Sequence, residues 1–139
     1  IDKIDGYTHD GNYLLIGEDG ANLVAKSTPI AFIAEGKFWV NNHAHVLEYK
    51  ENAMTQFMCH CLNIVNIQPY ITGGFQPKLS QGNLMLIPIP LPPLSEQQVI
   101  VSKLDELMRT CDELEASIRT SQQQNEMLLQ QVLREALNG

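Results

Sequence analysis

Five side chains of the types that bind metal ions lie in two short clusters of the sequence. His43 and His45 would point to one face of a strand, and residues 59–61 read Cys-His-Cys. On a helix, however, Cys59 and Cys61 would point about 200° apart, because successive residues are about 100° apart around the helix axis. The spacing also lacks the Cys-x-x-Cys pattern of zinc sites. We therefore expect no metal site, and a small metalloprotein that uses His43, His45 and Cys59 remains an alternative.

Catalytic motifs are absent from the sequence. It contains no Gly-x-Ser-x-Gly elbow for a serine nucleophile, and neither of the phosphate-binding loops GxxxxGK[ST] and GxGxxG. The three cysteines lie in apolar helical segments rather than in the electropositive clefts that activate a thiol. We expect no catalytic residue. The odd number of cysteines also favours a reducing compartment, so we expect a cytoplasmic protein.

Polar side chains that could contact nucleic acid gather in two predicted loops. Asn42 and His43 lie between two predicted strands, whereas Thr72, Gln76 and Lys78 follow a short predicted helix. Such side chains can bond to base edges or to phosphates. Lys78 is the candidate phosphate contact, and Gln76 could pair bidentately with adenine. On composition alone, ordinary solvated loops are the favoured interpretation.

The charge of the chain argues against a free-standing nucleic-acid binder. Its 139 residues include 9 Lys and Arg against 16 Asp and Glu, for a net charge of −7. Residues 1–90 carry five bases against eight acids, and residues 91–139 carry four against eight. DNA affinity comes mainly from cations that neutralise phosphates, so an acidic chain favours a module that binds protein. The 44% apolar content and the lack of an apolar run of about 18 residues predict a soluble globular chain with no membrane span.

Short elements must position the two polar loops. Strands are predicted at residues 13–16, 29–34, 37–40 and 44–49, and a helix at residues 55–66. Glu35-Gly36 suggests a hairpin turn between the second and third of these strands, and residues 17–20 suggest another turn. The sequence therefore predicts a compact α+β domain.

A proline-rich junction and a long helix follow this domain. Four prolines between residues 88 and 93 predict an extended, semi-rigid spacer. Ser95 is a candidate N-cap with Gln98 as its capping-box partner. Since no proline or glycine occurs from there to Leu137, we expect a helix of about 43 residues, roughly 64 Å long.

The apolar residues of this predicted helix repeat every three or four positions, as in a coiled coil. Heptad position a would hold Leu104, Cys111, Ile118, Asn125 and Val132, and position d would hold Ile100, Leu107, Leu114, Ser121, Leu128 and Glu135. Ser121 joins Asn125 in a polar centre of the seam, which would tune the register. The domain is too small to bury so long a stripe, so the helix needs a partner helix.

Two stretches of the chain resemble one protein family. Residues 72–80 read TGGFQPKLS, and residues 87–97 read IPIPLPPLSEQ at the entry to the helix, where KLDEL follows at residues 103–107. These runs resemble the specificity subunit of type I restriction–modification enzymes. Residues 15–20 and 38–45 also resemble its target recognition domains, so the resemblance covers essentially the whole chain.

The resemblance implies DNA recognition without catalysis in this chain. Such subunits have two target recognition domains, each followed by a long helix, and each domain reads one half of a split site in double-stranded DNA. The two helices pair antiparallel and set the spacing of the half-sites. Methyltransferase (modification) subunits and a restriction motor–nuclease subunit join them, and S-adenosylmethionine, ATP and Mg2+ belong to those partners. This chain resembles half of such a subunit, or a fragment of one.

Together, these observations predict an α+β chain in two parts. Residues 1–90 would form a small mixed α/β target recognition domain that is N-terminally incomplete, and residues 91–139 the Pro-rich junction and the coiled-coil spacer helix. We expect no cofactor in the chain itself. A homodimer, or pairing with a second equivalent helix, would bury the seam. The alternative function is a coiled-coil protein–protein interaction module with no DNA role.

Overall fold

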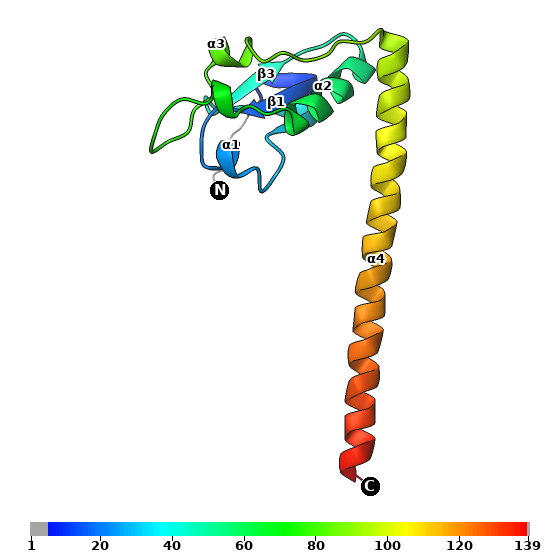
Figure 1. Ribbon diagram of the computed structural model, residues 1–139. Coiled ribbons are helices and arrows are strands. Elements are labelled where there is room, and N and C mark those ends of the chain that lie inside the picture. Colours follow the sequence, from blue (N-terminus) through cyan, green and yellow to red (C-terminus); the bar gives the residue numbers. More distant parts are fainter. Residues whose placement is uncertain (1–5, 139) are drawn as a thin grey trace. The chain divides into compact units, whose positions relative to one another are not determined.

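The computed structural model describes residues 6–138 and contains strands and helices in mixed order (Figure 1). In chain order the elements are β1 (His9–Gly17), α1 (Asn22–Ala25), β2 (Ala31–Phe38), β3 (Ala44–Leu47), α2 (Asn52–Ile64), the 3-10 helix η1 (Gln68–Tyr70), α3 (Gln81–Leu84) and α4 (Leu94–Asn138). The chain divides into two compact units, one up to Val101 and one from Ser102. The predicted α+β class is confirmed. No helix in the described part of the chain is long and apolar enough to span a membrane.

The first unit is built on a three-stranded antiparallel sheet in the order β2-β1-β3. The central strand β1 places Ile16 opposite Ala31 of β2 and opposite His45 of β3. Helix α2 packs against β1 and β2 (Figure 1). The buried cluster between these elements and the following loops consists of Leu14, Ile16, Leu23, Ile30, Ala31, Leu62, Ile67, Leu79, Leu84 and Ile87. Leu79 is fully buried, which fixes the segment that carries Lys78 to the core.

The hairpin predicted at Glu35-Gly36 is wrong, because β2 runs without a break from Ala31 to Phe38 along β1. Gly36 lies opposite Gly11 in this ladder and has a φ of +79°. A glycine adopts positive φ without steric cost, so the strand distorts there and then continues its pairing. The predicted strands at residues 29–34 and 37–40 are therefore one strand.

Two helix boundaries also differ from the sequence prediction. Helix α2 begins at Asn52 instead of Thr55 and ends at Ile64, where Val65 turns extended. The predicted Ser95 cap is wrong, because α4 begins at Leu94. The carbonyl of Pro93 accepts the first helical bonds, from the amides of Glu96 at 2.9 Å and Gln97 at 3.0 Å. A proline before the helix can serve here because capping by the backbone needs only its carbonyl oxygen.

The predicted extended junction and long helix are confirmed. Residues 87–93 form neither helix nor strand. Gln97, whose side chain is almost completely buried, donates from Nε2 to the carbonyl of Pro92 at 2.8 Å and so fixes the first turn of α4 to the junction. The helix then continues for 45 residues to Asn138.

Candidate nucleic-acid interface

The two polar loops predicted from the sequence meet at the end of β1. The amide of Glu18 donates to the carbonyl of His43 at 2.9 Å, and the amide of Leu79 donates to the carbonyl of Glu18 at 2.7 Å. The amide of Gly20 donates to the carbonyl of Pro77 at 3.0 Å. Backbone hydrogen bonds thus hold one loop on each side of Glu18-Asp19. The candidate residues His43 and Lys78, far apart in the sequence, consequently lie on one surface.

The loop of residues 72–78 is closed and rigid at its base. Thr72 and Lys78 exchange two backbone hydrogen bonds, of 2.8 and 2.7 Å, and the hydroxyl of Thr72 donates to the carbonyl of Lys78 at 3.3 Å. Gly73 has a φ of +84°, and a Cβ atom there would lie 2.3 Å from the carbonyl oxygen of Gln76. Only glycine fits this position without a backbone shift. The loop is therefore preorganised to present the residues at its tip.

The tip of this loop carries two exposed side chains. Gln76 is exposed, as a base-contacting residue must be. Phe75 beside it is fully exposed, although burial of a phenylalanine is favourable by about 1.5–3 kcal/mol. Sequence reasoning did not select Phe75. The available signal was a large apolar residue between a diglycine and polar residues in a loop that cannot bury it.

One ion pair and one histidine–carboxylate hydrogen bond engage the basic side chains of this surface. Lys78 Nζ lies 2.9 Å from Glu18 Oε1, and His43 Nδ1 lies 2.8 Å from Asp19 Oδ2. The hydrogen bond with Lys78 lowers the pKa of the Glu18 carboxyl, and the same bond raises the pKa of Lys78. Sequence reasoning assigned Glu18 and Asp19 only to a turn. The acidic balance of residues 1–90 was the signal that carboxylates would accompany the few bases.

The other predicted residues occupy distinct places on this surface. Asn42 is exposed beside Asn41, whose side-chain oxygen accepts the amide of His43 at 3.0 Å. His45, by contrast, is partly buried and bonds to the segment that carries Lys78. Its Nε2 lies 2.7 Å from the carbonyl of Leu79, and because a carbonyl only accepts, that nitrogen carries the proton.

Three of the side chains considered as metal ligands, His43, His45 and Cys59, make other contacts. His43 and His45 bond to different partners, as above, and the thiol of Cys59 donates to the carbonyl of Ala31 at 3.4 Å. Burial raises the pKa of the Cys59 and Cys61 thiols, which disfavours the thiolate that binds metal. Within residues 6–138 no three His, Cys, Asp or Glu side chains come together as a metal-binding group.

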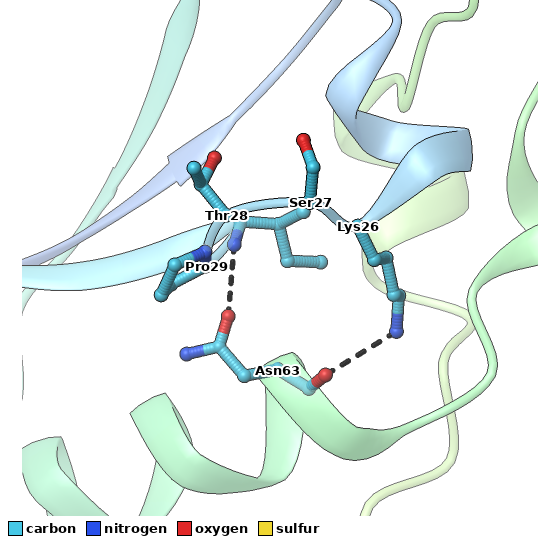
Figure 2. Close-up of a pocket in the computed structure, with 6 residues that line it drawn as sticks. Lys26, Ser27, Thr28, Pro29 and Asn63 are labelled. Atoms are coloured by element: carbon cyan, nitrogen blue, oxygen red, sulfur yellow. Dashed lines mark hydrogen bonds between the residues drawn. The ribbon is translucent and has the colours of Figure 1, made fainter. Parts of the chain in front are cut away.

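A cavity of about 270 Å³ lies between residues 26–30 and the end of α2. Figure 2 shows the Asn63 side chain reaching from α2 to this loop, and Lys26 reaching back to the backbone of Asn63. The Asn63 side-chain oxygen accepts the amides of Ile30 at 2.9 Å and Ala31 at 3.0 Å. Lys26 Nζ donates to the carbonyl of Val65 at 2.7 Å, where the carbonyl end of a helix attracts a cation. These polar groups bond to one another. We interpret the contacts of Lys26 and Asn63 as a clamp, that is, as a set of hydrogen bonds that fixes the start of β2 to the end of α2.

The predicted seam residues all lie on α4, and most are exposed. Exposed fractions are 50% for Leu107, 59% for Leu114 and Ile118, and 60% for Leu128. Ile100, Cys111, Asn125 and Val132 are also exposed, whereas Leu104 is partly buried. The second unit is a single helix over its described residues, so it cannot bury an apolar stripe within itself. Pairing of this helix stays a prediction.

Comparison with known proteins links most of the chain to one family. Residues 1–122 match the family model described as the type I restriction modification DNA specificity domain. A Haemophilus influenzae protein that carries the name of a type I restriction enzyme specificity subunit, S.HindORF215P, is 46% identical over 107 residues, which cover 76% of this chain and 27% of that protein. The EcoprrI specificity subunit of Escherichia coli is 30% identical over 98 residues, 70% of this chain and 23% of the relative. The chain thus spans about a quarter of the length of these curated relatives.

Proposed function

Because the chain belongs to the type I restriction modification DNA specificity family, we propose that its first unit reads one half of a bipartite DNA site. The observation that carries the proposal is the convergence of the two polar loops on one surface. Gln76 is exposed at the tip of a loop whose base is closed by hydrogen bonds, and His43 and Lys78 flank the same strand end. Amide side chains of this kind pair with adenine in the major groove, and lysine contacts phosphate.

The long helix supplies the second part of the proposal. We infer that α4 pairs with an equivalent helix, either in a second copy of this chain or in a longer subunit. An antiparallel pair would place two recognition units at opposite ends of the paired helices, and the helix length would set the distance between the half-sites. Pairing would also remove the apolar seam residues from water, which is favourable.

The chemistry of the assembled enzyme would reside in other subunits. We propose that methyltransferase and restriction subunits dock on this chain, and that they bind S-adenosylmethionine, ATP and Mg2+. The net charge of −7 supports such sharing, since Lys78 and few other cations could neutralise phosphates here. The isolated chain would therefore bind DNA weakly, and the complex would bind it tightly.

Selection from a library of random duplexes tests the proposal. The chain is incubated with the library at low salt, where phosphate contacts contribute most, and bound duplexes are sequenced over several rounds. We expect a short motif to be enriched. Gln76→Ala should relax one position of the motif, since the loss of a bidentate contact costs about 1–3 kcal/mol of discrimination.

One outcome of the selection would contradict the proposal. A folded chain that enriches no motif would remove the DNA-reading role. If that chain still paired through α4, the coiled-coil interaction module would replace DNA recognition as the function. Lys78→Ala serves as the comparison variant, because the loss of a phosphate contact lowers affinity for all sequences and leaves the motif unchanged.

A further inference from the structure

The carboxylates of Glu18 and Asp19 are less exposed than the side chains of Lys78 and His43 to which they bond. Glu18 is fixed on both sides by backbone bonds, from its amide to His43 and from the amide of Leu79 to its carbonyl. The side chains of Glu18 and Asp19 are only 21% and 20% exposed, whereas those of Lys78 and His43 are 53% and 56% exposed. Lys78 can therefore turn outward when it leaves its pair, whereas the backbone that carries Glu18 stays in place.

We propose that Glu18 and Asp19 compete with DNA phosphates for Lys78 and His43, and thereby weaken binding to duplexes that lack the target sequence. This inference rests on the proposed function, because it assigns the two acids to the same DNA-reading surface. A phosphate must displace a fixed carboxylate before it can contact Lys78. On a random duplex nothing compensates for that displacement. On the target, base contacts at Gln76 would compensate for it.

The location of the acids favours this role over a general surface charge. The carboxylates lie between the two loops that carry the candidate contacts, and Asp19 forms an isolated backbone bridge with Lys78 itself. An unpaired carboxylate so close to DNA would repel phosphate directly, and a paired one removes a cation from use. Both effects reduce sequence-independent affinity, which is the part of DNA binding that comes from phosphates.

The expected gain in affinity for a random duplex follows from the exposure of Lys78 and His43. Ion pairs with one well-exposed partner contribute little, so each substitution should strengthen binding to a random duplex by about two- to fivefold. If Lys78 becomes available for one more phosphate, the slope of log affinity against log salt should steepen by about 0.9. Affinity for the target should change less, because there Lys78 already contacts phosphate.

A double-mutant cycle with a matched control tests the competition. Affinity for a duplex of random sequence is measured by fluorescence anisotropy at several salt concentrations, for the full chain and for Glu18→Gln, Asp19→Asn, Lys78→Met and Glu18→Gln/Lys78→Met. Glu106→Gln is the control. It also removes one carboxylate from an ion pair with a lysine, because Glu106 Oε2 lies 2.7 Å from Lys103 Nζ on α4. We expect tighter binding for Glu18→Gln and Asp19→Asn, no gain for the double variant, and a change below about 1.5-fold for Glu106→Gln.

The outcomes separate this inference from the proposed function. If a motif is enriched from random duplexes but Glu18→Gln binds no more tightly than Glu106→Gln, the competition is refuted and DNA reading survives. The same variants are also eluted from heparin, a polyanion without bases. If the acid variants elute at higher salt but no duplex binds at any salt, DNA reading is refuted and the competition for anions survives. Asp19→Asn reports on the His43 pair independently, should Glu18→Gln fail to fold.

Discussion

The ammonium of Lys78 lies 2.9 Å from the carboxylate of Glu18, although the two residues are far apart in the sequence. The amide of Leu79, next to Lys78, donates to the carbonyl of Glu18, so main-chain and side-chain bonds join the same two segments. This double connection fixes the loop of residues 72–78 to the end of β1.

The Glu18–Lys78 pair makes stability depend on pH. Lys78 holds the pKa of the Glu18 carboxyl below its ordinary value of 4.5, so the stabilisation is present above that pH and is lost as the pH falls through the lower, folded value. Lys78 has its pKa raised above 10.5, so its share is present below that pH and is lost as the pH rises through the higher value. Glu18→Gln should flatten the acid loss in thermal unfolding measured between about pH 2 and 7. Glu48→Gln, at an exposed carboxylate, controls for the removal of one acid, and equal acid profiles for both variants would contradict the prediction.

Gly73→Ala should destabilise the loop of residues 72–78. A Cβ atom there would meet the carbonyl of Gln76 at 2.3 Å, and the φ of +84° strains any other residue. We expect a loss of about 1–3 kcal/mol in urea unfolding, with faster hydrogen exchange at the amides of Thr72 and Lys78. Gly74→Ala is the matched control, since nothing lies within 4 Å of its added Cβ. Equal stability of the two variants would show that the loop is not closed as described.

Asn63→Ala should release the start of β2 from α2. The substitution leaves the buried amides of Ile30 and Ala31 without their shared acceptor, and each unpaired buried donor costs about 1–3 kcal/mol. We expect a lower urea midpoint with an unchanged denaturant slope. Asn66→Ala is the control, because its side-chain oxygen accepts only an exposed amide, that of Gln68, and should cost less than about 1 kcal/mol. A similar midpoint for both variants would refute the clamp.

Leu107→Asp/Leu114→Asp should abolish self-association of the chain. Both side chains are at least half exposed on α4, and full burial in a paired seam is worth about 1.5–3 kcal/mol for each. Repulsion between acidic helices opposes pairing, but exposed charges are screened beyond about 8–10 Å at physiological salt. Sedimentation equilibrium should give a dimer for the wild type and a monomer for this variant.

The matched control for the helix is Ala116→Asp/Gln123→Asp. It adds the same two charges at heptad positions f, which face away from the seam, and should leave the dimer intact. A wild-type chain that stays monomeric at tens of micromolar would refute self-pairing. The seam would then be assigned to helices of a partner subunit.

The sequence by itself determined the features that depend on neighbouring residues. Prolines 88, 90, 92 and 93 exclude regular structure wherever they occur, so the extended junction could be predicted. The spacing of Leu104, Leu107, Leu114 and Ile118 predicts a helix because the period of an α-helix is fixed by its backbone geometry. The same local logic failed at Gly36 and Ser95. A glycine is compatible with a turn or with a distorted strand. A serine near a helix start need not be the cap, and here the helix begins one residue earlier, with the carbonyl of Pro93 as the acceptor of its first hydrogen bonds.

Only the tertiary structure decided which polar residues lie together. His43 and Lys78 were candidates from their residue types, but nothing local shows that Glu18-Asp19 lies between them. The convergence arises because β1 is the central strand and the buried Leu79 fixes the second loop to its end. Long-range backbone pairing depends on the packing of the whole core, and it decided that the acidic residues of this chain partner its bases at the candidate interface.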